Sequence, residues 1–254
     1  MKSAALYARH VRYVIGFIIG LMLIPSAYAS VTMLGSRVIY PSTASSVDVQ
    51  LKNNDDFPYV IQTWFDDGDV DAGPNQASAI PFVATPPVFR IQAKNGQVVR
   101  IAATGNKKLP QDRESVYWFN ILQIPPSNLE GTEKKNKMLV MLRTRVKLFY
   151  RPAAISAPVE QLKKLQVKLV WNSKQGLGVE IANPQPWFAS VTDIALTLGG
   201  QKRALHADMV SPFSQRTFWF SAIKNRPNSG GTVSLTVVND QGSRISEHYD
   251  VTLP

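Results

Sequence analysis

Cysteine is missing from all 254 residues of the chain. This absence excludes disulfide bonds and every metal site that is built from thiolates. Each folded domain must therefore be held together by its hydrophobic core alone. About 225 residues remain after the N-terminal segment described below, which is enough for two domains of ordinary size.

Long runs of basic residues are also missing, although the chain is basic overall. It has 28 Lys and Arg against 18 Asp and Glu, and no run of Lys and Arg exceeds two residues. Without Lys2, Arg9 and Arg12 of the N-terminal segment, 25 cations face 18 anions, a net charge of +7. This balance alone favours an acidic partner or nucleic acid. The missing basic cluster indicates a solvated surface and no nucleic-acid partner.

Motifs for catalysis or ligand binding are scarce. The sequence has no Gly-x-Ser-x-Gly, no phosphate-binding loop and no His-Glu-x-x-His. His206 and His248 each lack a spaced partner. The acidic stretch DDGDVDAGPN, residues 66–75, lacks the spacing and closing glutamate of an EF-hand, and such clusters commonly mark turns. We therefore predict no enzyme activity, no cofactor, no metal and no small-molecule substrate.

A long hydrophobic run occurs once, at the N-terminus. Lys2, Arg9 and Arg12 precede the apolar segment Val14–Ile24, and a small-x-small pattern ends at Ala29. Eleven apolar residues are too few to span a bilayer, which needs about 20. The alternative is a membrane anchor, but the pattern favours a signal peptide over residues 1–29 that is cleaved after Ala29. The mature chain is then exported.

Helical periodicity is weak, and short alternating segments between turns dominate. Val47, Val49 and Leu51 alternate with polar residues, which is the pattern of a strand with one buried face. The best helical candidate, residues 158–170, turns into strand-like alternation before a helical face builds up. Further strands are predicted at residues 59–65, 97–103, 115–124, 166–172, 177–183, 190–198, 216–220 and 231–239. This pattern predicts an all-β chain of sandwiches or barrels.

A proline- and alanine-rich segment, RPAAISAP at residues 151–158, separates two strand-rich halves. Segments of this composition commonly connect domains. We therefore predict an N-terminal domain over residues 30–150, a linker over 151–158 and a C-terminal domain over 159–254.

The stretch KMLVMLRTRVKLFYRP, residues 137–152, is unusual for a strand. Residues 138–142 are all apolar, so both faces are apolar, and Arg143, Arg145 and Lys147 then interrupt the pattern. One interpretation is a central strand that is buried on both sides. The other is an edge strand left open because it pairs with another chain, since proteins normally protect long apolar edges.

Six segments in order resemble the periplasmic pilus chaperones of the chaperone–usher family. The resemblance covers essentially the whole mature chain, and the short loop at residues 127–136 resembles the short-loop branch. The matching segments are GSRVIYPS (35–42), TPPVFRI (85–91), LPQDRESVYWFNILQIPP (109–126), RTRVKLFYRP (143–152), ANPQPWF (182–188) and VNDQG (238–242).

The resemblance implies a fold and a mechanism. The fold is two immunoglobulin-like β-sandwich domains in a boomerang arrangement. The mechanism is donor-strand complementation, in which the chaperone lends a strand to a pilus subunit that lacks one. Met138, Val140 and Leu142 would be the donor residues. Arg37 and Lys147 would hold the C-terminal carboxylate of the subunit.

The resemblance also implies an interdomain salt-bridge network of Glu114, Arg151 and Asp240. Its expected partners are pilus or fimbrial subunits and an outer-membrane usher, in the periplasm. When no subunit is bound, we expect the apolar edge to be capped by dimerisation or by ordering of the charged loop. The alternative function is a secreted immunoglobulin-like adhesin or lectin-type binding module, which would need no alternating apolar edge.

Overall fold

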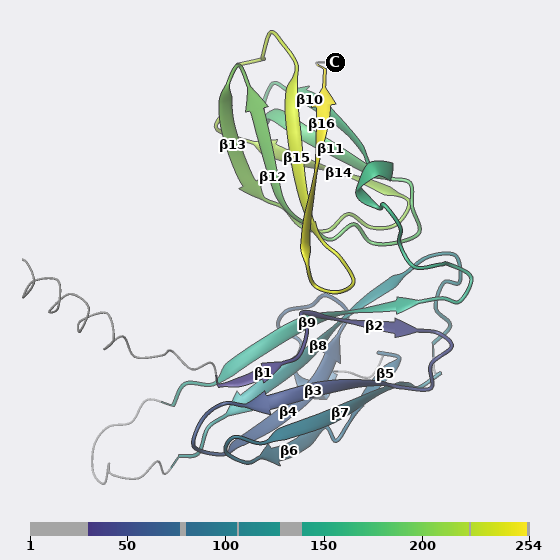
Figure 1. Ribbon diagram of the computed structural model, residues 1–254, viewed down its shortest axis with the longest axis vertical. Helices are drawn as coiled ribbons and strands as arrows, with labels where there is room; N and C mark the ends of the chain where they lie inside the picture. The colour runs from purple at the N-terminus through teal and green to yellow at the C-terminus, as the bar shows by residue number, and fades with distance from the viewer. Residues whose placement is uncertain (1–29, 77–79, 106, 128–138, 224, 253–254) are drawn as a thin grey trace, which may run out of the picture.

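The computed structural model of the protein describes residues 30–76, 80–105, 107–127, 139–223 and 225–252. The predicted signal peptide, most of the loop at 127–136 and the predicted donor residue Met138 lie outside the described residues. Among the described residues, no helix is long and apolar enough to cross a membrane. The chain forms strands almost throughout, in two domains that meet at an angle (Figure 1).

The N-terminal domain is a sandwich of two sheets. A four-stranded sheet has the order β1-β3-β7-β5, and a five-stranded sheet has the order β2-β9-β8-β4-β6. The strand bounds are β1 Val31–Met33, β2 Arg37–Pro41, β3 Val47–Asn53, β4 Tyr59–Asp66, β5 Phe82–Thr85, β6 Val88–Ile91, β7 Gly96–Ala103, β8 Ser115–Ile124 and β9 Leu142–Arg151.

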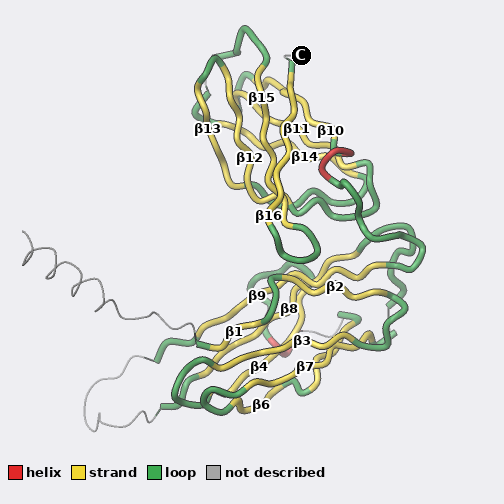
Figure 2. The backbone as a smooth tube through the Cα atoms, viewed as in Figure 1, coloured by secondary structure: helices red, strands yellow, loops and turns green. Residues whose placement is uncertain are grey.

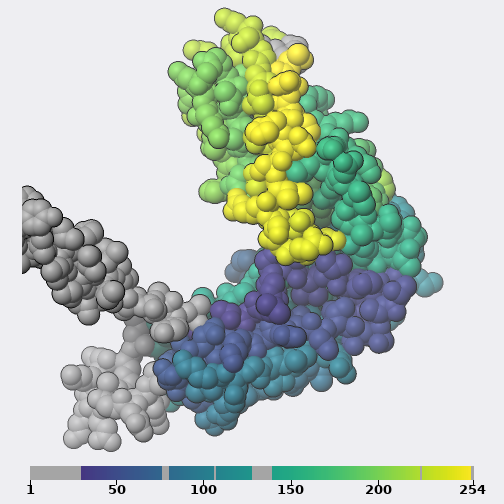
Figure 3. All heavy atoms as spheres, viewed as in Figure 1, coloured from purple at the N-terminus to yellow at the C-terminus, as the bar shows by residue number. Residues whose placement is uncertain are grey.

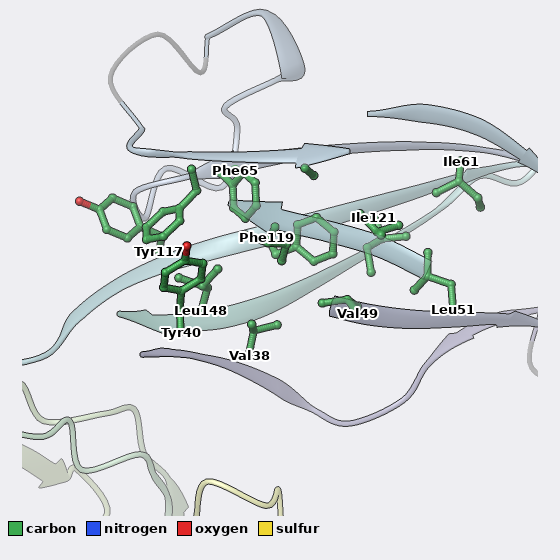
Figure 4. Close-up of a cluster of buried hydrophobic side chains, with 14 of the residues drawn as sticks. Val38, Tyr40, Val49, Leu51, Ile61, Phe65, Tyr117, Phe119, Ile121 and Leu148 are labelled. Atoms are coloured by element: carbon green, nitrogen blue, oxygen red, sulfur yellow. The ribbon is translucent and has the colours of Figure 1, made fainter. Parts of the chain in front are cut away.

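Alternation along these strands builds the first core. In β3 the side chains of Val49 and Leu51 are buried while those of Asp48 and Gln50 are exposed, as their sequence pattern predicts. Side chains from β2, β4, β8 and β9 meet those of β3 between the two sheets (Figure 4). Phe119 and Leu148 are fully buried there. This core anchors the middle of β9, so it fixes the strand on which the predicted site lies.

The C-terminal domain is a second sandwich. Its sheets have the orders β10-β11-β14 and β13-β12-β15-β16. A separate core of buried aliphatic and aromatic side chains lies between them. The strand bounds are β10 Gln166–Asn172, β11 Gly176–Asn183, β12 Val191–Leu198, β13 Gln201–His206, β14 Ser214–Phe220, β15 Gly231–Val238 and β16 Arg244–Val251.

The weak helical candidate at residues 158–170 is not an α-helix. It contains a single 3-10 turn, Leu162–Lys164, followed by β10 (Figure 2). Leu165 and Leu169 are buried in the core of the second sandwich. The alternation of apolar residues therefore outweighs the local helical propensity, because Leu165, Val167 and Leu169 pack against this core from every second position.

The turn between β15 and β16 brings the two domains together. Figure 3 shows the C-terminal segment against the N-terminal strands. Gly242 in this turn has a φ of +84°, and a Cβ there would lie 2.6 Å from the Ser36 Oγ of the other domain. Glycine is thus required for its backbone conformation, and the Ser36 hydroxyl would have to rotate away from any added Cβ.

Candidate functional site

Strand β9 is an internal strand in one half and an edge strand in the other. It pairs antiparallel with β8 along its whole length, from Leu142 to Tyr150. Its other side pairs in parallel with β2, but only from Lys147 to Arg151. Among the described strands, none pairs with that side between Leu142 and Val146. Half of β9 therefore offers unpaired backbone groups to another chain.

The residues that lead into this open edge are apolar and exposed. Val140 has 66% of its surface exposed and Leu142 has 53%, and Leu139 and Met141 are exposed as well. The interpretation of a strand buried on both sides is wrong for this segment. The reason is that residues 139–141 precede β9, and β2 begins to pair with β9 only at Lys147.

A groove of about 710 Å³ lies beside the open edge. One wall is made by Leu142, Thr144, Arg145 and Val146 of β9, and the other by β1 with Gly35 and Ser36. The side chain of Gln123 holds β1 in place, because it donates to the Val31 carbonyl oxygen and accepts from the Val31 N–H. The groove is therefore a fixed feature of the N-terminal domain.

The predicted anchor residues lie side by side where the open edge ends. Arg37 is the first residue of β2 and is directly opposite Lys147 in the parallel pairing. The Arg37 Nη1 donates to the Val238 carbonyl oxygen at 2.8 Å and to the Ser190 Oγ at 3.2 Å. The Lys147 Nζ lies 3.6 Å from the Asp208 Oδ1. Both cations therefore face the second domain.

Burial shapes the electrostatics of this pair. Loss of hydration lowers the pKa of Lys147, and the neighbouring Asp208 only partly offsets this effect. Loss of hydration also lowers the pKa of Arg37, with partial offsets from Asp240 and Glu114. A carboxylate placed between these two cations would gain two charge-assisted hydrogen bonds.

The structure brings Glu114, Arg151 and Asp240 together at the domain boundary. The Arg151 Nη2 lies 2.7 Å from the Glu114 Oε1, and the Arg151 Nη1 lies 2.7 Å from the Asp240 Oδ2. Burial raises the pKa of Glu114, against the opposing effects of the Phe188 N–H and Arg151. One guanidinium thus joins a carboxylate from each domain, in the fork geometry that suits arginine.

Several contacts at this boundary carry no sequence signal of their own. The Glu114 N–H donates to the Pro186 carbonyl oxygen and the Phe188 N–H donates to the Glu114 Oε2, each at 2.9 Å. Phe149 and Phe188 pack with their ring centroids 5.8 Å apart. Sequence reasoning also missed Asp208 as a neighbour of Lys147, because the two residues are far apart in the chain.

Both domains match known family models. Residues 30–156 match the pili and flagellar-assembly chaperone model, PapD N-terminal domain. Residues 160–249 match the pili assembly chaperone PapD model, C-terminal domain.

Relatives from three bacteria agree with these matches. The probable fimbrial chaperone YadV of Escherichia coli is 36% identical over 87% of this chain and 89% of its own length. A crystal structure of the YadV chaperone superposes with a TM-score of 0.72 at 32% identity, over 87% of this chain and 100% of that one. The chaperone protein HifB of Haemophilus influenzae is 40% identical over 86% of both chains.

A third relative is seen with its partner. A structure of the Salmonella enterica SafA pilin in complex with the SafB chaperone matches at 25% identity with a TM-score of 0.68, over 89% of this chain and 98% of that one. With two family models that together span residues 30–156 and 160–249, this chain belongs to the PapD-like pili-assembly chaperones and functions as a chaperone in pilus assembly.

Proposed function

We propose that this chaperone captures pilus subunits by lending them the apolar segment that leads into β9. The observation that carries the proposal is the juxtaposition of exposed Val140 and Leu142 with the Arg37–Lys147 pair on the same strand edge. The SafB relative is described in complex with a pilin, which supports a subunit as the partner. Met138 would be the third donor residue.

The direction of β2 predicts how the subunit strand lies. β2 runs parallel to β9 and begins at Arg37, opposite Lys147. A subunit strand added to the open edge along the same line, and in the same direction, would end where β2 begins. Its terminal carboxylate would then meet Arg37 and Lys147. Leu142 precedes Lys147 by five residues, about 16 Å along a strand, so the captured chain end would set the register of the donor residues.

The energetics of such a complex come from two sources. Burying each donor side chain would contribute about 1.5–3 kcal/mol before the entropy cost of association. Each charge-assisted bond to the carboxylate would contribute about 1.5–3 kcal/mol. The apolar contacts supply affinity and the cations supply the register, which accounts for both features of residues 137–152.

Co-expression tests the proposal. The chain, tagged at its C-terminus, is exported together with the pilus subunit that is encoded next to its gene, and the two proteins are purified through the tag. We expect a one-to-one complex and a longer lifetime of the subunit. A subunit that is degraded equally fast with and without the chaperone, and that never co-purifies, overturns the proposal.

The compartment and the remaining partners are part of the proposal. We place the mature chain in the periplasm after cleavage behind Ala29, and we expect it to deliver its subunits to an outer-membrane usher. Without a subunit, the open edge favours a self-capping dimer. The family assignment favours the chaperone over the adhesin or lectin-type module that the sequence left open.

Asp208 provides a test of the anchor in which the substitution is expected to strengthen subunit binding. Its carboxylate already lies beside Lys147 in the free protein, so an incoming chain end must compete with it. We expect Asp208→Asn to raise subunit affinity by up to about fivefold, because exposed ion pairs are worth at most about 1 kcal/mol. The measurement is a titration of the subunit against each chaperone.

Arg216→Met is the matched control for Asp208→Asn. Arg216 is the other cation on Asp208, at 3.1 Å, so its removal perturbs Asp208 and leaves Lys147 unchanged. We expect the control to give no gain in subunit affinity, because the charged Asp208 still lies beside Lys147. A loss of affinity in Asp208→Asn would show that Asp208 assists the anchor and does not compete with the subunit.

We also propose that Glu114, Arg151 and Asp240 fix the angle between the domains. Asp240→Ala removes the carboxylate that the second domain contributes to Arg151. We expect the domains to sample a wider range of angles, which small-angle scattering would detect as a broader distribution of sizes. Asp250→Ala, an exposed carboxylate in β16, is the control. A profile identical to the wild type, with normal subunit binding, would contradict the orienting role.

A further inference from the structure

Arg143 and Arg145 lie on the face of β9 that points away from the groove. Leu142, Thr144, Arg145 and Val146 line the groove. Side chains alternate along a strand, so the guanidinium of Arg145, like that of Arg143, lies on the opposite face, where Arg145 bonds to Asp66 and Arg143 to Asn120. The donor mechanism uses the groove side and the Lys147 anchor only. Two arginines next to an open apolar edge therefore still need an explanation.

Both arginines converge on Asp66, the last residue of β4. The Asp66 side chain is 0% exposed. Its Oδ2 accepts from the Arg145 Nε at 2.9 Å and from the Asn120 Nδ2 at 2.8 Å. Its Oδ1 accepts from the Arg145 Nη2 and from the Gly68 N–H. Burial alone would raise the pKa of Asp66, but the bonds from Arg145, Asn120 and Gly68 more than offset it and lower that pKa.

Arg143 extends the same cluster. Its Nε donates to the Asn120 Oδ1 at 2.9 Å, and its Nη2 lies 3.7 Å from the Asp66 Oδ2. The Arg143 guanidinium lies over the Trp64 ring at 4.9 Å, and that of Arg145 lies over the Trp118 ring at 4.5 Å. Each cation is therefore held by an aromatic face as well as by hydrogen bonds.

The cluster also fastens the acidic loop that follows β4. The Arg143 Nη1 donates to the Val70 carbonyl oxygen at 2.6 Å, and the Trp64 Nε1 donates to the Ala72 carbonyl oxygen at 3.0 Å. The stretch DDGDVDAGPN thus begins with a buried carboxylate that is bonded to side chains of β8 and β9 and to the Gly68 N–H of the stretch itself. Its first residue carries the structural role, and the loop folds back over the arginines.

The contacts cross three strands at one level of the sheet. Asp66 belongs to β4, Asn120 to β8, and Arg143 and Arg145 to β9. Along this part of β9, β8 is the only described strand that pairs with it. The cluster therefore ties down the half of β9 that has no second neighbour, from the face opposite the groove.

We propose that Asp66 is a positioning residue that holds the open half of β9 extended and in register before a subunit arrives. This inference rests on the proposed donor function and deepens it. A strand that is already ordered loses less conformational entropy on binding, so the subunit binds more tightly. The hydrogen bonds and ion pairs of Arg143 and Arg145 with Asp66 and Asn120 hold the open half of β9 against β8 and β4.

The test replaces the charged pair with a neutral one. In the double variant Asp66→Asn/Arg145→Met, the asparagine keeps the size of the side chain and the methionine keeps the contact with Trp118. Replacing a buried ion pair by neutral residues of similar volume commonly leaves global stability unchanged. We expect a melting temperature near that of the wild type. Hydrogen exchange of residues 142–146 in the free protein should become at least tenfold faster, and affinity for the co-expressed pilus subunit should fall about tenfold.

Asp48→Asn/Arg100→Met is the matched control, because this pair joins β3 and β7 in the other sheet at 3.1 Å. This control should leave hydrogen exchange at residues 142–146 unchanged.

Wild-type hydrogen exchange at residues 142–146 in the Asp66 variant, with a normal melting curve, overturns the positioning role. If the double variant does not fold, Arg143→Met is measured in its place, with the same expected direction and the same contradicting result. If the wild type binds no subunit, the proposed function fails, while the exchange measurement still decides this inference.

Discussion

Val140→Glu is expected to abolish subunit capture and to leave the free chaperone folded. Val140 is 66% exposed, so a glutamate there remains in water and the melting temperature should hardly change. In the complex, the same carboxylate would be forced into the apolar groove that the missing strand leaves in the subunit. It would have no partner there, at a cost of several kcal/mol. Since each 1.4 kcal/mol is about tenfold in affinity, most of a micromolar-to-nanomolar interaction would be lost. Circular dichroism measures whether the variant is folded, thermal melting measures its stability, and titration measures its affinity for the subunit.

Val159→Glu is the control for this substitution. Val159 is also 66% exposed, but it follows the end of β9 by eight residues and precedes the 3-10 turn Leu162–Lys164. We expect Val159→Glu to bind subunit normally. Two results would contradict the donor role of Val140. One is a melting temperature lowered by about ten degrees, on the order of 2 kcal/mol or more for a domain of this size. The other is a normal melting curve with normal subunit binding.

Lys147→Ala should have the second largest effect, a collapse of subunit recovery with little change in thermal stability. In the free protein, Lys147 forms one ion pair with a described residue, the 3.6 Å contact with Asp208. The side chain of Asp208 is exposed. Removing Lys147 leaves the terminal carboxylate of a subunit without one of its two cations. A loss of about 1.5–3 kcal/mol corresponds to roughly ten- to a hundredfold weaker binding. Co-purification and titration against the wild type measure it.

Lys168→Ala is the matched control, since Lys168 forms an ion pair of similar kind with Glu180 at 2.8 Å in the second domain. Subunit recovery by that variant should equal the wild type. Normal recovery by Lys147→Ala would refute the carboxylate anchor. Arg37→Ala should also lose subunit binding, but its interpretation is less direct. Arg37 donates to Val238 and Ser190 of the second domain, so the substitution also removes contacts between the domains.

The strands were largely predictable from the sequence. Alternation at Val47, Val49 and Leu51 predicted β3, and the segment 115–124 coincides with β8. Alternation of apolar and polar residues did not predict β13 or β16. Both are edge strands with largely exposed side chains, so no buried face marks them in the sequence.

The site residues were predictable through the family resemblance and not through periodicity. Nothing in the composition distinguishes Arg37 or Lys147 from other surface cations. Glu114, Arg151 and Asp240 are likewise ordinary charges until the fold places the Arg151 guanidinium 2.7 Å from a carboxylate oxygen of each acid. Asp66 was interpreted as part of a turn, because its buried partners lie 54 and 79 residues further along the chain.

The sequence by itself determined that this is an all-β chain with an unusually apolar segment before Arg143, because alternation and side-chain type are local properties. Only the tertiary structure decided that β9 is open from Leu142 to Val146 and closed by β2 from Lys147. It also decided that the cations of β9 serve different purposes, with Lys147 facing the second domain and Arg145 bound to Asp66. The physical reason is that edge and interior are defined by the strands alongside, and those strands come from distant parts of the chain.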